Sequence, residues 1–247
     1  MTYCLAMRLS DGLVFLSDSR TNAGVDNVST YQKLFIFHPE PDRLVVIQSA
    51  GNLATTQEVM DRLQQDLEQP GPNGSLATGS HLFEVALYLG RVSTEVAERH
   101  RPQLAASGAD GTSTFILGGQ IGTDPPDILL VYPEGNYIRA SEDRPFLQIG
   151  ETKYGKFLLE LATEAQLPIE SAAKVALSSM VSTAHANLSV GPPYDLGLYR
   201  PGSFQVEHAR ITPDSPFLDR LQETWARHLD AALAELPMVE PGDLELR

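Results

Sequence analysis

Thr2 is the residue whose type and position most directly suggest chemistry, because only Met1 precedes it. Removal of Met1 would place a hydroxyl nucleophile and a free α-amine on the same residue. A threonine that is activated by an N-terminal amine is one known form of nucleophilic catalysis. Thr is also an ordinary second residue, so this interpretation depends on which other residues could assist Thr2.

Asp18 and Lys33 are the charged residues that could assist it. Asp18 lies in the block Ser17-Asp18-Ser19-Arg20-Thr21-Asn22-Ala23-Gly24 at the end of an apolar segment. Lys33 is one of only four lysines and lies inside the apolar segment 31–37. If that segment is a strand, alternation places Tyr31, Lys33 and Phe35 on one face. A buried lysine needs a carboxylate partner, and Asp18 is the candidate. The alternative is a surface lysine on an edge strand.

A hairpin would bring these groups to one end of a sheet. The turn Ser10-Asp11-Gly12 joins two apolar segments, so the start of the first strand and the end of the second lie side by side. Thr2 opens the first strand and Asp18 closes the second, while Lys33 near the start of a third fits the same end. A lysine ammonium there would lower the pKa values of the threonine hydroxyl and of the α-amine. An amine that titrates near 8 would then act as a base at neutral pH.

The stretch Ser49-Ala50-Gly51-Asn52-Leu53 passes from a predicted strand to a predicted helix. The backbone N–H of Gly51 could therefore stabilise the oxyanion of a tetrahedral intermediate. The alternative is a helix-capping turn in which glycine is needed only for its backbone angles.

The apolar pattern predicts strands, two helices, strands, two helices, strands and a last helix. The first fifty residues read as a strand meander, with strands at 3–9, 13–18, 31–37 and 43–49. Helices are expected at about 51–67 and 81–100, at 152–165 and 169–187, and at 215–235. A second sheet is expected from 112–118, 127–132, 136–140 and 146–149, and a late hairpin from 194–200 and 204–210. This order predicts an α+β fold in which two antiparallel sheets are stacked between helix pairs.

Composition excludes several classes of function. The 247 residues are 42% hydrophobic and carry a net charge of -14, which disfavours nucleic acid and anionic membrane surfaces as partners. Cys4 is the only cysteine, so no intramolecular disulfide can form, and no Cys/His spacing predicts a metal site. The sequence predicts no cofactor. No apolar run reaches the roughly 18 residues of a membrane span, and no signal peptide precedes Thr2, so we expect a cytoplasmic protein.

Together, the N-terminal Thr, the SDSRTNAG block, the strand lysine and the AGNLA turn resemble the proteasome β-type subunits, which are N-terminal nucleophile hydrolases. The segments MTYCLAMRLSDGLVFLSDSRTNAGVDNVSTYQK, IGETKYGK and NLSVGPPYDL are most similar to the bacterial proteasome-like family Anbu, the ancestral β subunit.

The resemblance implies a four-layer αββα sandwich with Thr2 as nucleophile. Asp18 and Lys33 would activate it, and the Gly51 N–H would bind the oxyanion. Ser49 and Leu53 would line the pocket for the residue before the scissile bond, and Thr21 and Asn22 would lie along the substrate cleft. Such proteins assemble into rings or open-ring spirals, so self-association is expected.

Three features differ from the proteasomal pattern. Only Met1 has to be removed here, in place of a propeptide. Glu151 stands where a serine supports the nucleophile, and its carboxylate would raise the pKa of the amine. The proteasomal Asp-x-x-Ser-Gly segment aligns with Asn187-Leu188-Ser189-Val190-Gly191, which lacks the Asp and retains Ser189 only on a shifted alignment.

The sequence therefore predicts one peptidase domain over residues 1–247, with a helical extension at about 212–247. The first hypothesis is a homo-oligomeric threonine-type endopeptidase that cleaves peptides or unfolded proteins. The alternatives are an amidase that acts on small amides and a weakly catalytic assembly or scaffold protein. The physiological substrate and any ATPase partner are not predicted.

Overall fold

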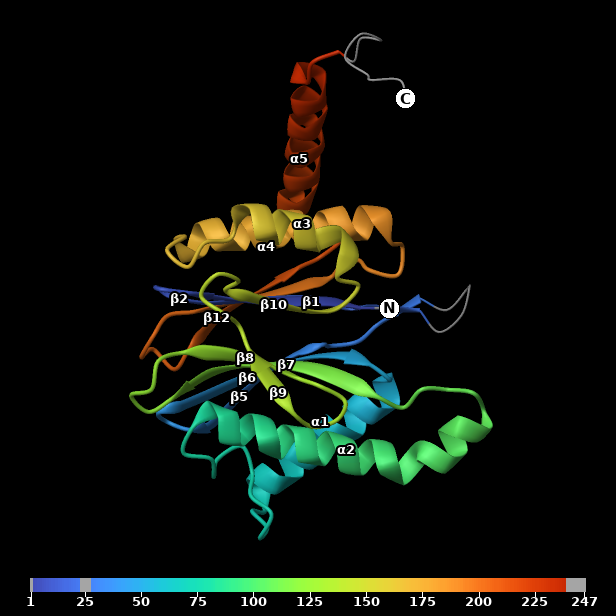
Figure 1. Cartoon of the computed structure of the whole chain (residues 1–247), viewed down its shortest axis with the longest axis vertical. Helices are drawn as coiled ribbons and strands as arrows, with labels where there is room; N and C mark the ends of the chain where they lie inside the picture. The colour runs from blue at the N-terminus through green and yellow to red at the C-terminus, as the bar shows by residue number, and fades with distance from the viewer. Residues whose placement is uncertain (1, 23–27, 239–247) are drawn as a thin grey trace, which may run out of the picture. The chain divides into compact units, whose positions relative to one another are not determined.

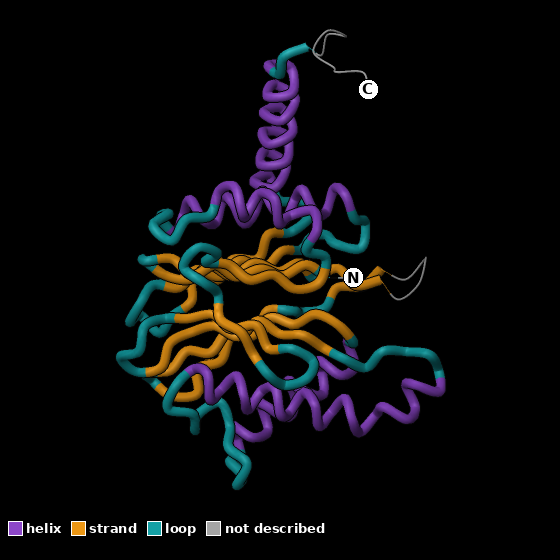
Figure 2. Tube along the Cα trace, in the orientation of Figure 1, coloured by secondary structure: helices purple, strands orange, loops and turns teal. Residues whose placement is uncertain are grey.

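The computed structural model describes residues 2–22 and 28–238, with the side chains of Asn22 and Val28 excepted. The chain divides into two compact units, residues 1–211 and 212–247. The first unit stacks two antiparallel sheets between two pairs of helices, as Figures 1 and 2 show. This arrangement is the four-layer αββα sandwich.

The first sheet has the strand order β10-β1-β2-β11-β12. Its centre is the hairpin of β1 and β2, in which Cys4 pairs with Ser17 and Leu9 with Gly12 around the turn at Ser10 and Asp11. The five strands are β1 (Tyr3–Leu9), β2 (Gly12–Asp18), β10 (Phe146–Gly150), β11 (Tyr194–Tyr199) and β12 (Val206–Ile211).

The second sheet has the strand order β5-β6-β7-β8-β9. The strand β6 lies between β5 and β7 and is buried over nearly all of its length. The five strands are β5 (Leu34–Glu40), β6 (Arg43–Gly51), β7 (Ser113–Ile121), β8 (Asp127–Val131) and β9 (Tyr137–Arg139).

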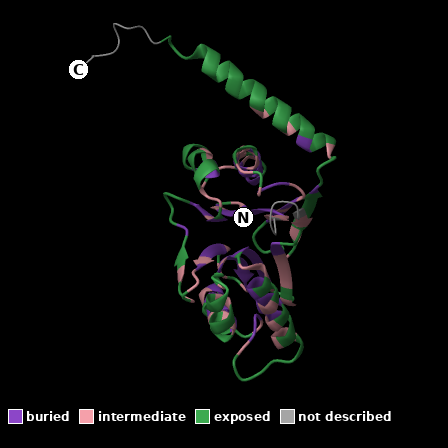
Figure 3. Cartoon of the chain, turned by 90° about the vertical axis from the view of Figure 1, so that its right-hand side faces the viewer, coloured by how far each residue is buried: buried purple, intermediate pink, exposed green. Residues whose placement is uncertain are grey.

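Helices cover the outer face of each sheet because their apolar sides pack on it. The pair α1 (Leu53–Glu68) and α2 (Leu82–Ala106) lies on the second sheet, and the pair α3 (Lys153–Ala162) and α4 (Ile169–Ala186) lies on the first. One apolar cluster lies under α1 and α2, and another fills the space between the sheets. Figure 3 shows the buried residues of this unit gathered in the strands and on the helix sides that face them.

Alternation along β6 separates these two clusters. Val45 and Ile47 belong to the cluster under α1 and α2, whereas Leu44, Val46 and Ala50 belong to the cluster between the sheets. The two faces of β6 therefore look into different parts of the interior.

The predicted helices and most of the predicted strands are present, but the assignment of strands to sheets was wrong. The hairpin at 3–18 lies in the first sheet, whereas β5 and β6 lie in the second, so the first fifty residues are not one meander. In addition, β6 pairs with β7, and β10 pairs with β1. Strand order depends on pairing between distant segments, which local hydrophobic patterns do not encode.

Two local expectations also need correction. Residues 31–33 are not part of a strand, because β5 begins at Leu34, so the shared face of Tyr31, Lys33 and Phe35 does not exist. A small hairpin of β3 (Arg20–Asn22) and β4 (Val28–Thr30) was not predicted.

The second unit contains α5 (Pro216–Glu235). The acidic, proline-containing end of the tail lies outside the described residues. Across residues 2–22 and 28–238, no helix combines the length and the apolar character needed to cross a membrane.

Candidate active site

Thr2 lies directly before β1 and next to the end of β10. Its carbonyl oxygen accepts a hydrogen bond from the backbone N–H of Glu151 at 2.7 Å. Gly150 has a φ of 83°, and a Cβ atom at this position would lie 1.9 Å from the Thr2 carbonyl oxygen. Glycine is therefore required at 150 for the chain to approach Thr2 this closely. Met1, whose removal the sequence interpretation requires, lies outside the described residues.

The ion pair of Lys33 and Asp18 joins the two sheets beside Thr2. Lys33 Nζ donates to Asp18 Oδ1 at 2.8 Å and to the Arg20 carbonyl at 2.6 Å. Lys33 is 4% exposed and Asp18 is fully buried, so the pair is shielded from water. The expected contact between these two residues is therefore present.

Asp18 also holds the main chain that carries the candidate nucleophile. Its Oδ1 accepts from the backbone N–H of Tyr3 at 3.0 Å, and its Oδ2 lies 3.4 Å from the N–H of Gly191. Burial raises the pKa of the Asp18 carboxyl above its ordinary value. The Lys33 ammonium and the two N–H groups oppose this rise, because each of them favours the charged carboxylate.

The path of the chain explains how Lys33 reaches Asp18. Asp18 ends β2 in the first sheet, and Lys33 precedes β5 in the second, so the segment between them passes from one sheet to the other. At that point Ser49 N donates to the Lys33 carbonyl at 3.0 Å, which fixes the Lys33 backbone beside β6. The side chain then extends back across the space between the sheets.

Gly51 is the last residue of β6, and its N–H does not take part in the hydrogen bonding between β6 and β7. On the β7 side Asn52 N donates to the Thr112 carbonyl at 3.0 Å, whereas Ser49 N donates toward Lys33. Because the N–H groups along a strand alternate between its two neighbours, the Gly51 N–H points to the β5 side. Gly51 lies three residues beyond Gln48, the partner of the first residue of β5. Asn52 caps α1 by accepting from Thr55 N at 3.1 Å, so this N–H lies at the positive end of a helix.

The four predicted substrate-contacting residues lie at this same end of the sandwich. Ser49 is buried, and its carbonyl accepts from the Cys4 thiol at 3.7 Å. Leu53 opens α1 and is half-buried. Thr21 lies in β3 opposite Ser29, and the backbone of Asn22 ends that strand.

Glu151, Asn187 and Ser189 form one hydrogen-bonded network next to Thr2. Asn187 Nδ2 donates to Glu151 Oε2 at 3.0 Å, and Asn187 Oδ1 accepts from Ser189 N at 3.0 Å and from Ser189 Oγ at 2.5 Å. Glu151 lies next to Thr2, because its backbone N–H donates to the Thr2 carbonyl oxygen. The structure thus brings all three predicted supporting residues together.

Several contributing groups carried no signal in the sequence. The N–H groups of Tyr3 and Gly191 act through the backbone, which any residue but proline supplies. The Tyr3 hydroxyl is bonded to Ser179 Oγ at 2.7 Å, and burial raises its pKa to about 12. Arg20 lies against Gly191 and donates to the Leu188 carbonyl at 2.9 Å, which ties the segment after α4 to the site.

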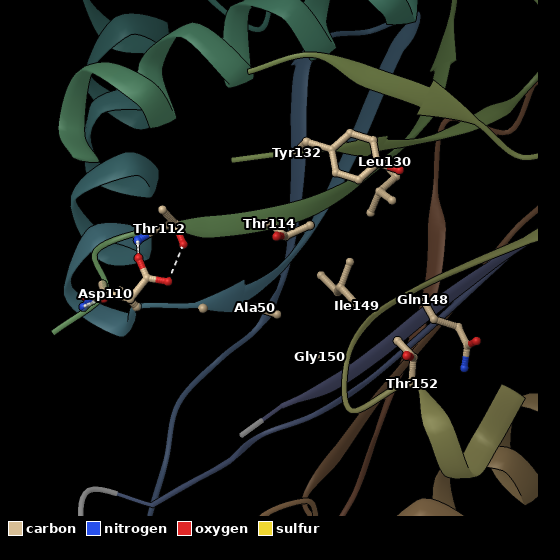
Figure 4. A pocket seen from close by; sticks show the side chains of 12 residues that line it. Ala50, Asp110, Thr112, Thr114, Leu130, Tyr132, Gln148, Ile149, Gly150 and Thr152 are labelled. Carbon is tan, nitrogen blue, oxygen red and sulfur yellow. Dashed lines mark hydrogen bonds between the residues drawn. The ribbon is translucent and has the colours of Figure 1, made fainter. Parts of the chain in front are cut away.

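A cavity of about 570 Å³ opens between the sheets at this end of the molecule (Figure 4). It is lined by Ala50, Gly51, Asn52, Asp110, Thr112, Thr114, Leu130, Tyr132, Gln148, Ile149, Gly150 and Thr152. Ser49, Leu53 and Thr21 are not among the lining residues. In the parts of the chain that the structure describes, no group of three or more His, Cys, Asp or Glu side chains could hold a metal ion.

The stacked antiparallel sheets between helix pairs, with Thr2 at the start of a central strand, define a proteasome-like sandwich of the N-terminal nucleophile hydrolase type. Known structures agree with this class. Anbu from Yersinia bercovieri is 42% identical, with a TM-score of 0.89, over 96% of this chain and 98% of that chain. The structure described as the helical assembly of the Anbu complex from Pseudomonas aeruginosa is 41% identical, with a TM-score of 0.91, over 97% and 99%.

A Gly-1 mutant of Anbu from Hyphomicrobium sp. strain MC1 is 38% identical, with a TM-score of 0.89, over 97% of this chain and all of that one. No family model matches the sequence, and no curated protein matches it. The similarity in sequence and in structure shows that the chain belongs to the Anbu, or ancestral beta-subunit, family of proteasome-like proteins.

Proposed function

We propose that the chain is a threonine-type peptidase whose nucleophile is Thr2, freed by cleavage from Met1. The observation that carries the proposal is the buried ion pair of Lys33 and Asp18, 2.8 Å long, in which Asp18 also accepts from the amide that joins Thr2 to Tyr3. A buried ion pair contributes little to the stability of a fold when it is compared with well-packed apolar residues of similar volume. Its position beside a hydroxyl nucleophile favours a catalytic role.

In the proposed reaction, the Thr2 α-amine takes the proton from Thr2 Oγ as Oγ attacks the carbonyl carbon of a peptide bond. The Gly51 N–H stabilises the oxyanion of the tetrahedral intermediate, and the Lys33 ammonium favours the developing alkoxide. The amine then gives its proton to the leaving nitrogen, and the C–N bond breaks. Water attacks the resulting ester by the same proton transfers and releases Thr2.

The proposal includes self-association into a ring or an open-ring spiral. Its support is the relative from Pseudomonas aeruginosa, which is described as forming a helical assembly. Residues 1–211 would act as the peptidase domain, with residues 212–247 as its helical extension. A peptide or an unfolded protein would be the substrate, Thr21 and Asn22 would line its path, and the protein would act in the cytoplasm.

Mass spectrometry of the purified assembly, before and after treatment with a peptide epoxyketone, tests this proposal. The warhead forms its ring adduct only with a hydroxyl and a free amine on one residue. We expect loss of Met1 and an adduct on Thr2, and we expect Thr2→Ala to remove both adduct and peptide cleavage while thermal unfolding is unchanged. Full turnover by Thr2→Ala would overturn the proposal.

The network of Glu151 and Asn187 gives a specific reason to consider an assembly protein with weak catalysis. A carboxylate near the Thr2 amine would favour the protonated amine, which is not a base. Retained Met1, or a Thr2 that the epoxyketone does not label, would support this second function. Cleavage of short amides without cleavage of longer unfolded peptides would instead support an amidase that uses the same residues.

A further inference from the structure

The 570 Å³ cavity between the sheets has no assigned role, and its place in the site suggests one. Its volume falls within the range of about 300–1,000 Å³ that is typical of ligand sites. Its wall includes Gly51, the candidate oxyanion donor, and Gly150, which lies against the Thr2 carbonyl. The cavity therefore begins where the scissile bond of a substrate would lie in the proposed function.

The cavity lies on the opposite face of β6 from the predicted pocket for the residue before the scissile bond. Ala50 lines the cavity and faces the other sheet, in the same apolar cluster as Ile149. Ser49 is its neighbour on the strand and faces α1, where Leu53 begins the helix. Gly51 ends the strand between these two regions.

This division sets the direction of a bound peptide. A carbonyl held at the Gly51 N–H, with the preceding side chain near Ser49 and Leu53, sends the following residues to the other side of Gly51. The cavity occupies that side, where the leaving amine of the proposed reaction would depart.

The lining has a clear chemical character. Among its twelve residues, all of which the structure describes, Asp110 is the only one with a charged side chain, and none is Lys, Arg or His. Hydroxyl and amide side chains make up half of the lining: Asn52, Thr112, Thr114, Tyr132, Gln148 and Thr152.

Asp110 is held in place and remains ionised. Its Oδ1 accepts from Thr112 N and its Oδ2 from Thr112 Oγ1, each at 2.9 Å, and Asn52 Nδ2 donates to its carbonyl at 2.9 Å. The Thr112 N–H lowers the pKa of the Asp110 carboxyl below its ordinary value. Figure 4 shows this carboxylate with its two bonds on one side of the cavity, with Ile149 and Thr152 across from it.

We propose that this cavity binds the residues of a peptide substrate that follow the scissile bond, and that Asp110 selects a basic side chain there. This inference rests on the proposed function. It identifies the substrate class as peptides with lysine or arginine just after the cleaved bond. It also implies that an acidic residue or a nearby C-terminal carboxylate in that position weakens binding.

The test uses internally quenched peptides that share all residues before the scissile bond and carry Lys, Gln or Glu at the two positions after it. An exposed charge pair contributes up to about 1 kcal/mol, or about fivefold, for attraction or for repulsion. We therefore expect kcat/KM for the Lys peptide to exceed that for the Glu peptide about tenfold at low salt, and less at high salt.

Three variants sharpen the result. Asp110→Asn keeps an acceptor for Thr112 N–H but removes the charge, so the Lys:Glu ratio should fall to about twofold. Thr114→Lys places a cation in the lining and should reverse the preference. Asp143→Asn makes the same charge change in an exposed loop outside the cavity and should leave the ratio unchanged.

Epoxyketone labelling in parallel separates failure of this inference from failure of the proposed function, because that reagent carries only the residues before the scissile bond. If Thr2 is labelled and the three peptides are cleaved equally well, the cavity inference is overturned and the peptidase proposal stands. If Asp143→Asn changes the ratio as much as Asp110→Asn, the inference is also overturned. If Thr2 is not labelled and no peptide is cleaved, both fail.

Discussion

Each end of the sandwich carries an ion pair that joins one sheet to the other, but the two pairs differ in burial. At the Thr2 end, where Gly51 and Gly150 also lie, Lys33 and Asp18 are both buried. At the turn end, where the Ser10–Asp11 turn lies, Arg8 of β1 donates to Asp127 of β8 at 3.1 Å. There Arg139 of β9 also binds Asp127, and half of its side chain is exposed.

The difference indicates what each pair does. The carboxylate of Asp127 is buried, but the two arginines that pair with it keep contact with water, so this cluster desolvates one charge and leaves its cations hydrated. The ammonium of Lys33 loses that contact and bonds to Asp18 and to a backbone carbonyl. Both charges of the pair are therefore buried at the Thr2 end, whereas only the carboxylate is buried at the turn end. A buried pair contributes little net stability, so the proposed catalytic role would account for its retention.

Lys33→Met should have the largest effect. It removes the cation and leaves Asp18 as an uncompensated buried charge, so we expect a loss of about 3–5 kcal/mol in the free energy of unfolding. Activity should fall by about 10³-fold or more, as for other residues that act as a unit in catalysis. Urea unfolding and kcat/KM on one peptide measure the two effects.

Two further variants test the cause of that loss. Adding Asp18→Asn to Lys33→Met should recover most of the stability and none of the activity, because the buried charge is then gone. Arg8→Met breaks the corresponding pair at the turn end, where Asp127 keeps Arg139 as a partner. If Arg8→Met destabilises the protein as much as Lys33→Met, the contrast between the two ends does not hold.

The acid side of the pH profile should depend on Asp18. Burial raises the pKa of this carboxyl, so protonation begins at a higher pH than the ordinary value of about 3.9 for aspartate. Since the protonated acid is no longer a partner for the Lys33 ammonium, kcat/KM should fall about tenfold per unit as pH drops below that pKa. Arg8→Met should not shift the acid limb of the pH profile of kcat/KM. An acid limb with an apparent pKa at or below the ordinary value for aspartate would contradict the prediction.

Substitution of one glycine at each end compares the two ends without changing any charge. Gly150 and Gly202 have φ values of 83° and 73°, which strain any residue with a Cβ atom. Gly202 lies at the turn end, where its backbone N–H donates to Gln120 Oε1. A Cβ atom at Gly202 would meet nothing within 4 Å. At Gly150 it would overlap the Thr2 carbonyl.

Gly150→Ala should therefore destabilise the protein by about 1–3 kcal/mol more than Gly202→Ala, because overpacking is added to backbone strain. It should also reduce epoxyketone labelling of Thr2, which Gly202→Ala should leave intact. Thermal unfolding and labelling rates of the two variants, measured side by side, decide the point. Equal losses would mean that the close approach at Thr2 is not constrained.

The arrangement at the Thr2 end could be predicted from the sequence only in part. The proximity of Thr2 and Asp18 follows from one local hairpin. Lys33 could be singled out because a lysine is unusual inside an apolar segment. The face assigned to Lys33 was wrong, because β5 begins at Leu34 rather than at residue 31, which leaves Lys33 before the strand with its side chain crossing to the other sheet. The N–H of Gly191 reaches Asp18 from 173 residues away, and a backbone donor leaves no mark in the residue types.

Arg139→Gln should have the smallest effect. Asp127 would keep its bonds from Arg8 at 3.1 Å and from its own neighbour Ile128 N at 2.9 Å, so no charge is left unpaired. We expect a loss of about 0.2–1 kcal/mol in the free energy of unfolding, because Arg139 is half exposed and Asp127 keeps Arg8 as its partner.

The stronger test is on activity. Because Arg139 lies at the turn end, Arg139→Gln should leave kcat/KM, the acid limb and epoxyketone labelling as they are in the unsubstituted protein. Arg144→Gln, which removes another exposed arginine from its pair with Glu160, is the matched control for the change in net charge. A loss of activity in Arg139→Gln that the control does not share would show that the two ends are coupled through β8 and β9. The turn end would then be part of the catalytic apparatus rather than a fastening of the sheets.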